Sequence, residues 1–337
     1  MSLADKSLQL IVLLFFSCFS TCFASEQLII EPEMGRAPIL SLMNDAKSSI
    51  KLVIYGLTDE QFINALIKAK NKGKNVQVLL EPKPYRAEGE NTSAMQKLHA
   101  DDIALQQPNP DFKLLHQKTL LIDQNYAVIM TFNFTHSTFK KERNFALIIT
   151  DPAELQEIQN VFSADWQHKN IAVNNPNLVW SPNNSREKIL ELIHQAHSSI
   201  KIYAEGLSDY RVIGALAKAA RSGANVQVLM SAEWNKRDNK KFAYLSKAGV
   251  NVRFSKNYMI HAKVILIDQK RALLGSINLT KPSMDDNREL SVITNSANIV
   301  NALNSTFDTD WREANFPKKY AKKEVLRFLK QVLRANF

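Results

Sequence analysis

The 337-residue chain is 45 % hydrophobic and 23 % charged, a composition that excludes a disordered protein and is typical of a globular one. Its length predicts two domains, each large enough to bury a core, while 9 Gly and 11 Pro exclude collagen-like and Gly-rich architectures. The formal net charge of +10 favours an anionic partner, such as nucleic acid, a membrane surface or a phosphorylated substrate.

The N-terminal segment has the layout of a secretory signal. An apolar run from Leu8 to Phe19 leads into a stretch of mostly small residues that ends at Ala24. We predict a signal peptide over residues 1–24 and a secreted or periplasmic mature chain. An uncleaved anchor is the alternative, although this apolar stretch is shorter than the roughly 20 residues that span a bilayer. Cys18 and Cys22 both lie here, so the mature chain has no thiol for a disulfide, a nucleophile or a zinc site.

The remainder of the chain is an internal duplication. Ser48–Leu79 matches Ser198–Leu229 at a constant offset of 150 residues, and the later Asp165-Trp166 matches Asp310-Trp311 at an offset of 145. We interpret the Asp-Trp pairs as structural anchors of a helix. Each copy is far longer than a solenoid repeat, which indicates two related lobes. We expect a first lobe over residues 25–175, a second over residues 176–316 and a separate C-terminal helix over residues 317–337.

Each lobe alternates helix and strand. In the second copy, we expect a helix from Asn184, a strand over Ser199–Tyr203, a helix opened by Asp209, and a second strand over Val226–Met230. Strand, helix and strand joined by short turns imply a right-handed crossover and parallel pairing. The predicted fold class is therefore α/β: two homologous sandwich lobes with mixed sheets flanked by helices.

Both lobes carry the pattern H-x-K-x4-D at equivalent places. It comprises His116, Lys118 and Asp123 in the first lobe and His261, Lys263 and Asp268 in the second. Each His and Lys would share one face of an apolar strand, and the next strand adds a hydroxyl and an amide. These polar residues are Thr131 and Asn133 in the first lobe, and Ser276 and Asn278 in the second.

Such a set of groups can bind and attack a phosphate ester. The lysines supply positive charge, and the asparagines with the hydroxyls can donate hydrogen bonds to phosphoryl oxygens. One neutral imidazole can attack phosphorus while a protonated one delivers a proton to the leaving oxygen. The alternative is that each His and Lys merely satisfy one another in a core strand, which the repetition of the motif disfavours.

The paired motif resembles that of the phospholipase D superfamily, H-x-K-x4-D-x6-G-S/T-x-N. The second lobe fits throughout, with Gly275 at the glycine position, whereas the first lobe has Met130 there. The resemblance implies a pseudo-twofold arrangement with one active site between the lobes, a phosphohistidine intermediate and no metal or organic cofactor. It also places an acid eleven residues beyond each Asn, which is Glu289 in the second lobe but Asn144 in the first.

The difference between Glu289 and Asn144 distinguishes the two histidines. If each orients the histidine of its own lobe, Glu289 favours a charged His261 and Asn144 leaves His116 neutral. We therefore predict that His116 is the nucleophile and His261 the general acid, the order that the family usually follows.

Two other features are weaker. His194 and His197 fall on a predicted helix, and a solvated helix face is a simpler interpretation than a metal site. The loop over residues 233–241 contains Trp234, Lys236 and Arg237, which are candidate substrate contacts or simply an exposed basic loop.

The C-terminal segment concentrates the positive charge. Residues 318–337 carry seven Lys and Arg against one Glu, and they form an apolar stripe of Val325, Leu329, Val332 and Leu333. Such a helix can lie on anionic lipid as a peripheral anchor, or it can pack on the second lobe.

We therefore expect a secreted, monomeric phospholipase D-type enzyme that hydrolyses or transfers phosphatidyl groups of phospholipids. The first alternative is an exported non-specific endonuclease, which would need only phosphate contacts. The second is an inactive module that binds lipid or nucleic acid, which the intact His, Lys and Asn residues of both lobes argue against.

Overall fold

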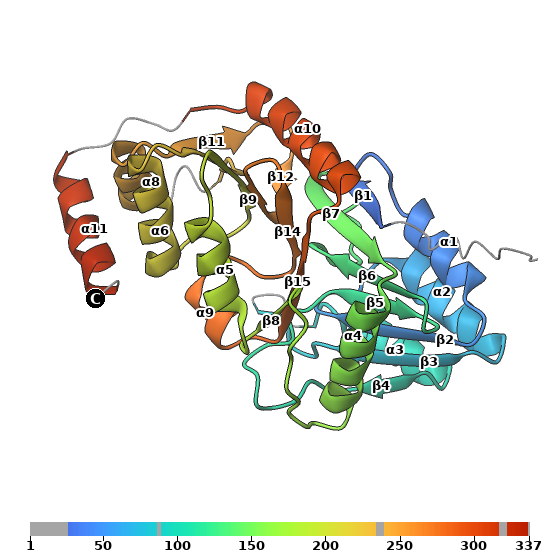
Figure 1. Cartoon of the computed structure of the whole chain (residues 1–337). Helices are drawn as coiled ribbons and strands as arrows, with labels where there is room; N and C mark the ends of the chain where they lie inside the picture. The colour runs from blue at the N-terminus through green and yellow to red at the C-terminus, as the bar shows by residue number, and fades with distance from the viewer. Residues whose placement is uncertain (1–25, 86–88, 234–238, 317–321, 336–337) are drawn as a thin grey trace, which may run out of the picture.

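The computed structural model describes residues 26–85, 89–233, 239–316 and 322–335 (Figure 1). The predicted signal peptide and the loop residues Trp234, Lys236 and Arg237 lie outside the described residues. Within the described part of the chain, no helix is long and apolar enough to cross a membrane.

The first sheet is mixed and belongs to the first copy of the duplication. Its strands lie in the following order: β1 (Gln27–Glu31), β7 (Glu142–Ile149), β6 (Tyr126–Met130), β5 (Thr119–Ile122), β2 (Ser49–Ile54), β3 (Asn75–Leu80) and β4 (Ala104–Gln106). Strands β2, β3 and β4 are parallel, and the other neighbours are antiparallel.

The second sheet repeats this order strand for strand. It runs through β8 (Leu178–Ser181), β15 (Glu289–Thr294), β14 (Arg271–Gly275), β13 (Lys263–Ile267), β9 (Ser199–Ala204), β10 (Asn225–Ser231) and β11 (Asn251–Ser255). The two sheets share a topology, which confirms the α/β fold class and the two related lobes. A short strand of the second lobe, β12 (Met259–Ile260), leaves its own sheet and pairs with β7 of the first.

Helices cover the outer face of each sheet (Figure 1). In the first lobe they are α1 (Ala37–Asp45), α2 (Glu60–Asn71) and α3 (Thr92–Ala100). In the second they are α5 (Ser185–His194), α6 (Tyr210–Arg221), α8 (Asn239–Lys247) and the short α9 (Lys281–Asp285). Helix α6 begins where the sequence predicted, because the Asp209 side chain accepts hydrogen bonds from the free N–H groups of Arg211 and Val212.

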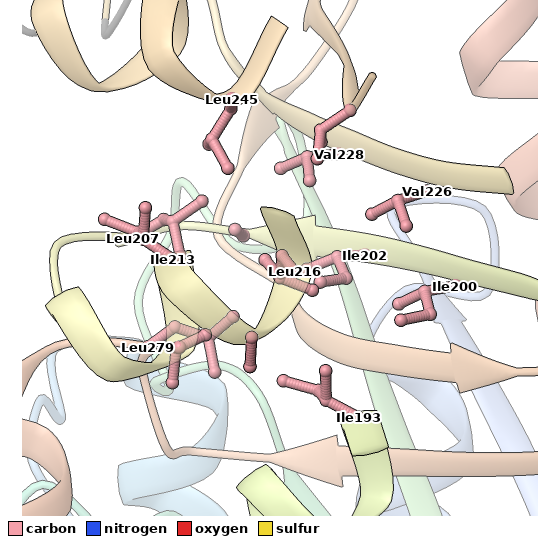
Figure 2. Close-up of a cluster of buried hydrophobic side chains, with 14 of the residues drawn as sticks. Ile193, Ile200, Ile202, Leu207, Ile213, Leu216, Val226, Val228, Leu245 and Leu279 are labelled. Carbon is pink, nitrogen blue, oxygen red and sulfur yellow. The ribbon is translucent and has the colours of Figure 1, made fainter. Parts of the chain in front are cut away.

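The alternation of apolar residues along the strands of the second copy explains how the core of the second lobe forms. Ile200 and Ile202 alternate on β9, and Val226 and Val228 alternate on β10, so one face of both strands is apolar. Figure 2 shows these side chains meeting Ile213 and Leu216 of α6. Burying this face ties the helix to the two parallel strands.

A further apolar layer lies between the two sheets. It combines side chains from both lobes, such as Leu121 and Leu147 with Val264 and Leu274, and it takes in α4 (Pro152–Trp166) and α10 (Ala297–Glu313). The aromatic rings of Phe145 and Tyr203 meet across it, with centroids 5.3 Å apart. The lobes therefore share this central layer in addition to their own cores, and the layer fixes their mutual orientation.

Two buried ion pairs cross the interface between the lobes. Arg143 of β7 pairs with Asp310 of α10 at 2.7 Å, and Arg288 pairs with Asp165 of α4 at 2.8 Å. The repeated Asp-Trp pairs thus do more than anchor a helix by packing, because their carboxylates bind the arginine of the opposite lobe. The arginines are themselves equivalent in the duplication, so the two contacts obey the pseudo-twofold symmetry.

Helix α11 (Lys322–Ala335) packs on the second lobe against α6 and α8. Phe328 and Val332 are buried in that contact and Leu329 is partly buried, whereas Leu333 is 48 % exposed. The helix therefore packs on the second lobe, the second of the two outcomes that the sequence allowed, and this contact covers Val332 of the predicted apolar stripe and leaves Leu333 exposed.

Candidate active site

The segments that precede β5 and β13, which contain His116 and His261, each cross to the opposite lobe. The backbone N–H of His116 donates to the carbonyl of Arg288 at 3.0 Å, and that of His261 donates to the carbonyl of Arg143 at 3.3 Å. The regular strand begins only after each histidine, at Thr119 in β5 and at Lys263 in β13. The prediction that each His and Lys share one face of a strand was therefore wrong, because both histidines and Lys118 precede the strand and only Lys263 lies on it.

Because of this crossing, His116 contacts the acid of the second lobe. Its Nδ1 lies 2.9 Å from Oε2 of Glu289, which is completely buried. The other carboxylate oxygen of Glu289 accepts from the Ser283 hydroxyl and, at 3.3 Å, from the Asn287 amide. Burial raises the pKa of Glu289, but the attraction of His116 and Lys118 outweighs it and keeps that pKa below its usual value.

An ionised carboxylate only accepts, so Nδ1 of His116 carries the proton that it donates to Glu289. In the neutral imidazole the Nε2 lone pair is then free. Burial lowers the pKa of His116, and the attraction of Glu289 offsets this only in part, so the neutral form prevails at neutral pH. The Tyr55 ring lies edge-on to the imidazole, with centroids 4.9 Å apart.

His261 contacts an amide of the first lobe instead. Its Nδ1 lies 3.2 Å from Oδ1 of Asn144 and 3.7 Å from Oε2 of Glu142. The Asn144 amide is held in this orientation because Oδ1 accepts from the Thr131 hydroxyl at 2.8 Å and Nδ2 donates to Glu142 at 2.9 Å. On its other side, Nε2 of His261 lies 3.6 Å from Oε1 of Glu205.

The predicted pairing of Glu289 with His261 and of Asn144 with His116 was therefore wrong. The physical reason is the strand crossing, which brings each histidine beside the β7 or β15 residues of the opposite lobe. The two copies also place their acid and amide in opposite order, as Glu142-Arg143-Asn144 in one and Asn287-Arg288-Glu289 in the other. As a result, the imidazole of His116 faces a carboxylate directly and that of His261 faces an amide.

The two lysines lie beside the histidines and differ in their surroundings. Lys118 is 1 % exposed and donates to the carbonyl of His116 at 2.6 Å. Burial, together with the charge of Lys263, lowers the pKa of Lys118 to about 7. Lys263 donates to the carbonyls of His261 at 2.6 Å and Thr131 at 3.1 Å, and pairs with Glu205 at 2.5 Å. One site thus contains cations from both lobes.

The asparagines occupy equivalent positions beside the lysines. Oδ1 of Asn133 accepts from the N–H of Gly56 at 3.2 Å, and Oδ1 of Asn278 accepts from that of Gly206 at 3.1 Å. These bonds turn the amide nitrogens away from the glycines, and Nδ2 of Asn278 donates to Glu205 at 3.1 Å. A Cβ atom at Gly56 would lie 3.2 Å from Cγ of Asn133, which is tighter than an ordinary contact, so the close approach favours a glycine.

Thr131 and Ser276 are completely buried. The Thr131 hydroxyl accepts from the N–H of Phe145 at 3.0 Å, and the Ser276 hydroxyl accepts from that of Leu290 at 3.1 Å. Both hydroxyls therefore join adjacent strands, and this geometry revises the prediction that they contact a substrate.

The motif aspartates lie at the far end of their strands from the histidines. Asp123 accepts backbone N–H bonds of 2.7–3.2 Å from residues 47–49, and Asp268 accepts the equivalent bonds from residues 197–199 at 2.7–2.9 Å. These bonds outweigh burial and hold the pKa of Asp123 at about 2. The aspartates therefore fix the start of β2 and β9, and the prediction that they are catalytic is corrected to a structural role.

The glycine of the motif has a steric purpose in the second lobe. Gly275 has φ of +156°, and a side chain there would lie 2.4 Å from the carbonyl oxygen of Leu290. Met130 takes the equivalent position in β6 and points into the apolar core of the first lobe, so the substitution disturbs no polar group of the site.

Sequence reasoning missed Glu205, Glu142 and Tyr55. Glu205 and Tyr55 are equivalent in the duplication, and both directly follow a parallel strand, β9 or β2. The position could have been found from the sequence, because polar residues that directly follow parallel strands gather at one edge of a sheet, where sites form. Aligning the two copies places Tyr55 and Glu205 at such a position.

The described residues hold no group of three or more His, Cys, Asp or Glu placed to bind a metal ion. His194 and His197 are both exposed, at the end of α5 and just beyond it, and the backbone of His197 donates to Asp268.

Comparisons with known proteins agree with this geometry. The family model described as "Cardiolipin synthase, PLD-like domain" matches twice, over residues 39–166 and 189–311. Cardiolipin synthase B of Escherichia coli is 26 % identical over 286 residues, which cover 72 % of this chain and 69 % of that protein. A polyphosphate kinase of Vibrio parahaemolyticus is 28 % identical over 199 residues, but the match covers only 28 % of that protein's length.

Among solved structures, the phosphatidylserine synthase of Haemophilus influenzae has the same fold. It superposes with a TM-score of 0.66 at 12 % sequence identity, covering 92 % of this chain and 93 % of that one. The likeness extends over both lobes, and the family match coincides with the two copies that carry the H-x-K-x4-D motifs. The chain therefore belongs to the phospholipase D-like family.

Proposed function

We propose that this protein cleaves phosphodiesters of phospholipids through a phosphohistidine intermediate, with His116 as nucleophile and His261 as general acid. The observation that carries the proposal is the contact between Nδ1 of His116 and the buried carboxylate of Glu289. It leaves Nε2 unprotonated, as a nucleophile requires, and stabilises the positive charge that the imidazole gains when it is phosphorylated. The crossed pairing thus supports the same assignment of roles as the sequence, for a different reason.

In the first step, Nε2 of His116 attacks phosphorus, the bond to the leaving alkoxide breaks, and His261 donates its proton to that oxygen. The positive charges of Lys118 and Lys263 offset the negative charge on the phosphoryl oxygens, and the amides of Asn133 and Asn278 donate hydrogen bonds to these oxygens. In the second step, His261 removes a proton from water or an acceptor alcohol, whose oxygen attacks phosphorus and frees His116. Burial lowers the pKa of His261 to about 4 against the opposing charge of Glu205, so the negative charge of the bound phosphodiester has to raise it to give the protonated imidazole that the first step needs.

The proposal of a lipid substrate rests on similarity to relatives that are named for phospholipid chemistry. The match to cardiolipin synthase B covers most of both chains and favours a phosphatidyl substrate over a nucleic acid. Helix α11 contributes less to this choice than its sequence implied, since it packs on the second lobe and buries Val332 of its apolar stripe there. The apolar run before Ala24 supports export to the periplasm or beyond.

The test is to assay the chain from Ser25 onward on phosphatidylcholine and phosphatidylglycerol vesicles and on single-stranded DNA, each with EDTA. We expect release of the lipid head group, persistence of activity in EDTA, and none in His116→Ala. Cleavage of DNA without cleavage of lipid would replace the proposed substrate with a nucleic acid. Loss of activity in EDTA, restored by a divalent cation, would contradict phosphate binding by Lys118 and Lys263.

A further inference from the structure

The phosphate-binding half of the second lobe already contains an anion of its own. Glu205 places Oε2 2.5 Å from Nζ of Lys263 and 3.1 Å from Nδ2 of Asn278, while its Oε1 lies 3.6 Å from Nε2 of His261. These three groups are the ones expected to receive phosphoryl oxygens and the leaving group. A carboxylate side chain therefore occupies the position that matches a bound phosphate.

This arrangement is specific to one lobe. The equivalent residue of the first lobe is Tyr55, whose ring lies beside His116 and 5.2 Å from Nζ of Lys118. The phosphate-binding groups of the first lobe are thus flanked by an aromatic ring, and those of the second by a charge. Burial alone would raise the pKa of Glu205, but the attraction of His261 and Lys263 outweighs it, so the carboxylate stays ionised.

We propose that Glu205 makes the site discriminate against doubly charged phosphate monoesters in favour of singly charged diesters. This inference rests on the proposed phosphodiesterase function. A diester carries one negative charge, whereas the monoester that its hydrolysis produces carries close to two at neutral pH, since its second pKa is about 6. Because Coulomb repulsion is linear in charge, a carboxylate close to the phosphate penalises the product twice as strongly as the substrate.

The consequence for the reaction is release of product. Phosphoryl oxygens bound to Lys263 and Asn278 must displace the Glu205 carboxylate or share its partners, and the 32 % exposure of this side chain gives it room to turn outward. When hydrolysis adds the second negative charge, repulsion from Glu205 rises and the monoester leaves. Without the carboxylate, two lysines would hold the product more firmly than the substrate.

The test compares methyl phosphate and dimethyl phosphate at pH 7.5, with binding to the purified protein measured by calorimetry. Glu205→Gln keeps the size of the side chain and removes its charge. Allowing for screening of a partly exposed group, we expect dimethyl phosphate to bind about tenfold tighter and methyl phosphate about a hundredfold tighter. Glu205→Asp is the matched control, because it keeps the charge and should change the ratio of the two affinities little.

Equal changes for the two ligands in Glu205→Gln, or no change, would overturn the inference while leaving the phosphodiesterase function intact. Failure of every form, wild type included, to bind either ligand would overturn the proposed function and this inference with it. Should Glu205→Gln fold poorly by circular dichroism, Glu205→Ala supplies the same comparison of ratios. Hydrolysis assays should agree, with stronger inhibition of Glu205→Gln than of wild type by added methyl phosphate.

Discussion

Replacing Glu289 by Gln tests the crossed pairing of the active site. The substitution keeps the shape of the side chain but removes the charge 2.9 Å from Nδ1 of His116. In the reaction, His116 becomes positively charged when its Nε2 bonds to phosphorus, and the buried carboxylate stabilises that charge. Two unit charges about 4 Å apart at an effective dielectric constant near 20 interact by about 4 kcal/mol, an upper bound of about 10³-fold in rate. We therefore expect kcat to fall by about 10² to 10³-fold.

The assay that distinguishes the two pairings uses leaving groups of different quality. Because Glu289 acts on the nucleophile, Glu289→Gln should lose about as much activity on bis(p-nitrophenyl) phosphate, which needs little protonation, as on a natural diester. The matched control is Glu142→Gln, which changes the carboxylate 3.7 Å from Nδ1 of His261. It should impair the natural diester more than the p-nitrophenyl one. If Glu289→Gln spared the p-nitrophenyl substrate, Glu289 would serve the general acid, and its pairing with the nucleophile His116 would be refuted.

Three other predictions concern the histidines, the pH profile and the lobe interface. His261→Ala should keep more activity on bis(p-nitrophenyl) phosphate than on a natural diester, whereas His116→Ala should be inactive on both. Mass spectrometry should locate the phosphoryl adduct on His116, and an adduct on His261 would reverse the two roles. The kcat/KM profile should be bell-shaped. Its acid limb should lie below the ordinary histidine pKa, because the pKa of His116 is lowered. Its basic limb should lie no higher than about pH 7, because burial lowers the pKa of His261 to about 4 and that of Lys118 to about 7, and both act in their charged forms. A profile flat from pH 6 to 9 would contradict this. Arg288→Met should lower the free energy of unfolding, measured in urea, by about 3–5 kcal/mol, because it leaves the buried Asp165 carboxylate without its partner. The control is Lys97→Met, which removes the exposed ion pair with Glu60 and should lower that free energy by about 1 kcal/mol or less.

The sequence determined the fold class and the residues that carry the chemistry. Repetition at a nearly constant offset predicts two lobes of one topology, and each copy has the helix caps and alternating apolar residues that form its own elements. Asp209 and the alternation of Ile200 with Ile202 are local signals, readable because capping and strand periodicity depend only on neighbouring residues. The paired histidines and lysines were equally visible, since they recur at fixed spacing.

The tertiary structure alone decided which groups meet. Glu289 lies 28 residues from His261 in sequence but contacts His116, 173 residues away, because the segment before each catalytic strand pairs with the opposite lobe. The same is true of the Arg143–Asp310 and Arg288–Asp165 ion pairs. Glu205 has no motif at all, and only its approach to Lys263 and His261 shows that a carboxylate lies among the phosphate-binding groups. Which residues of one lobe contact which residues of the other depends on how the two folded lobes pack together. Local sequence patterns do not specify that packing.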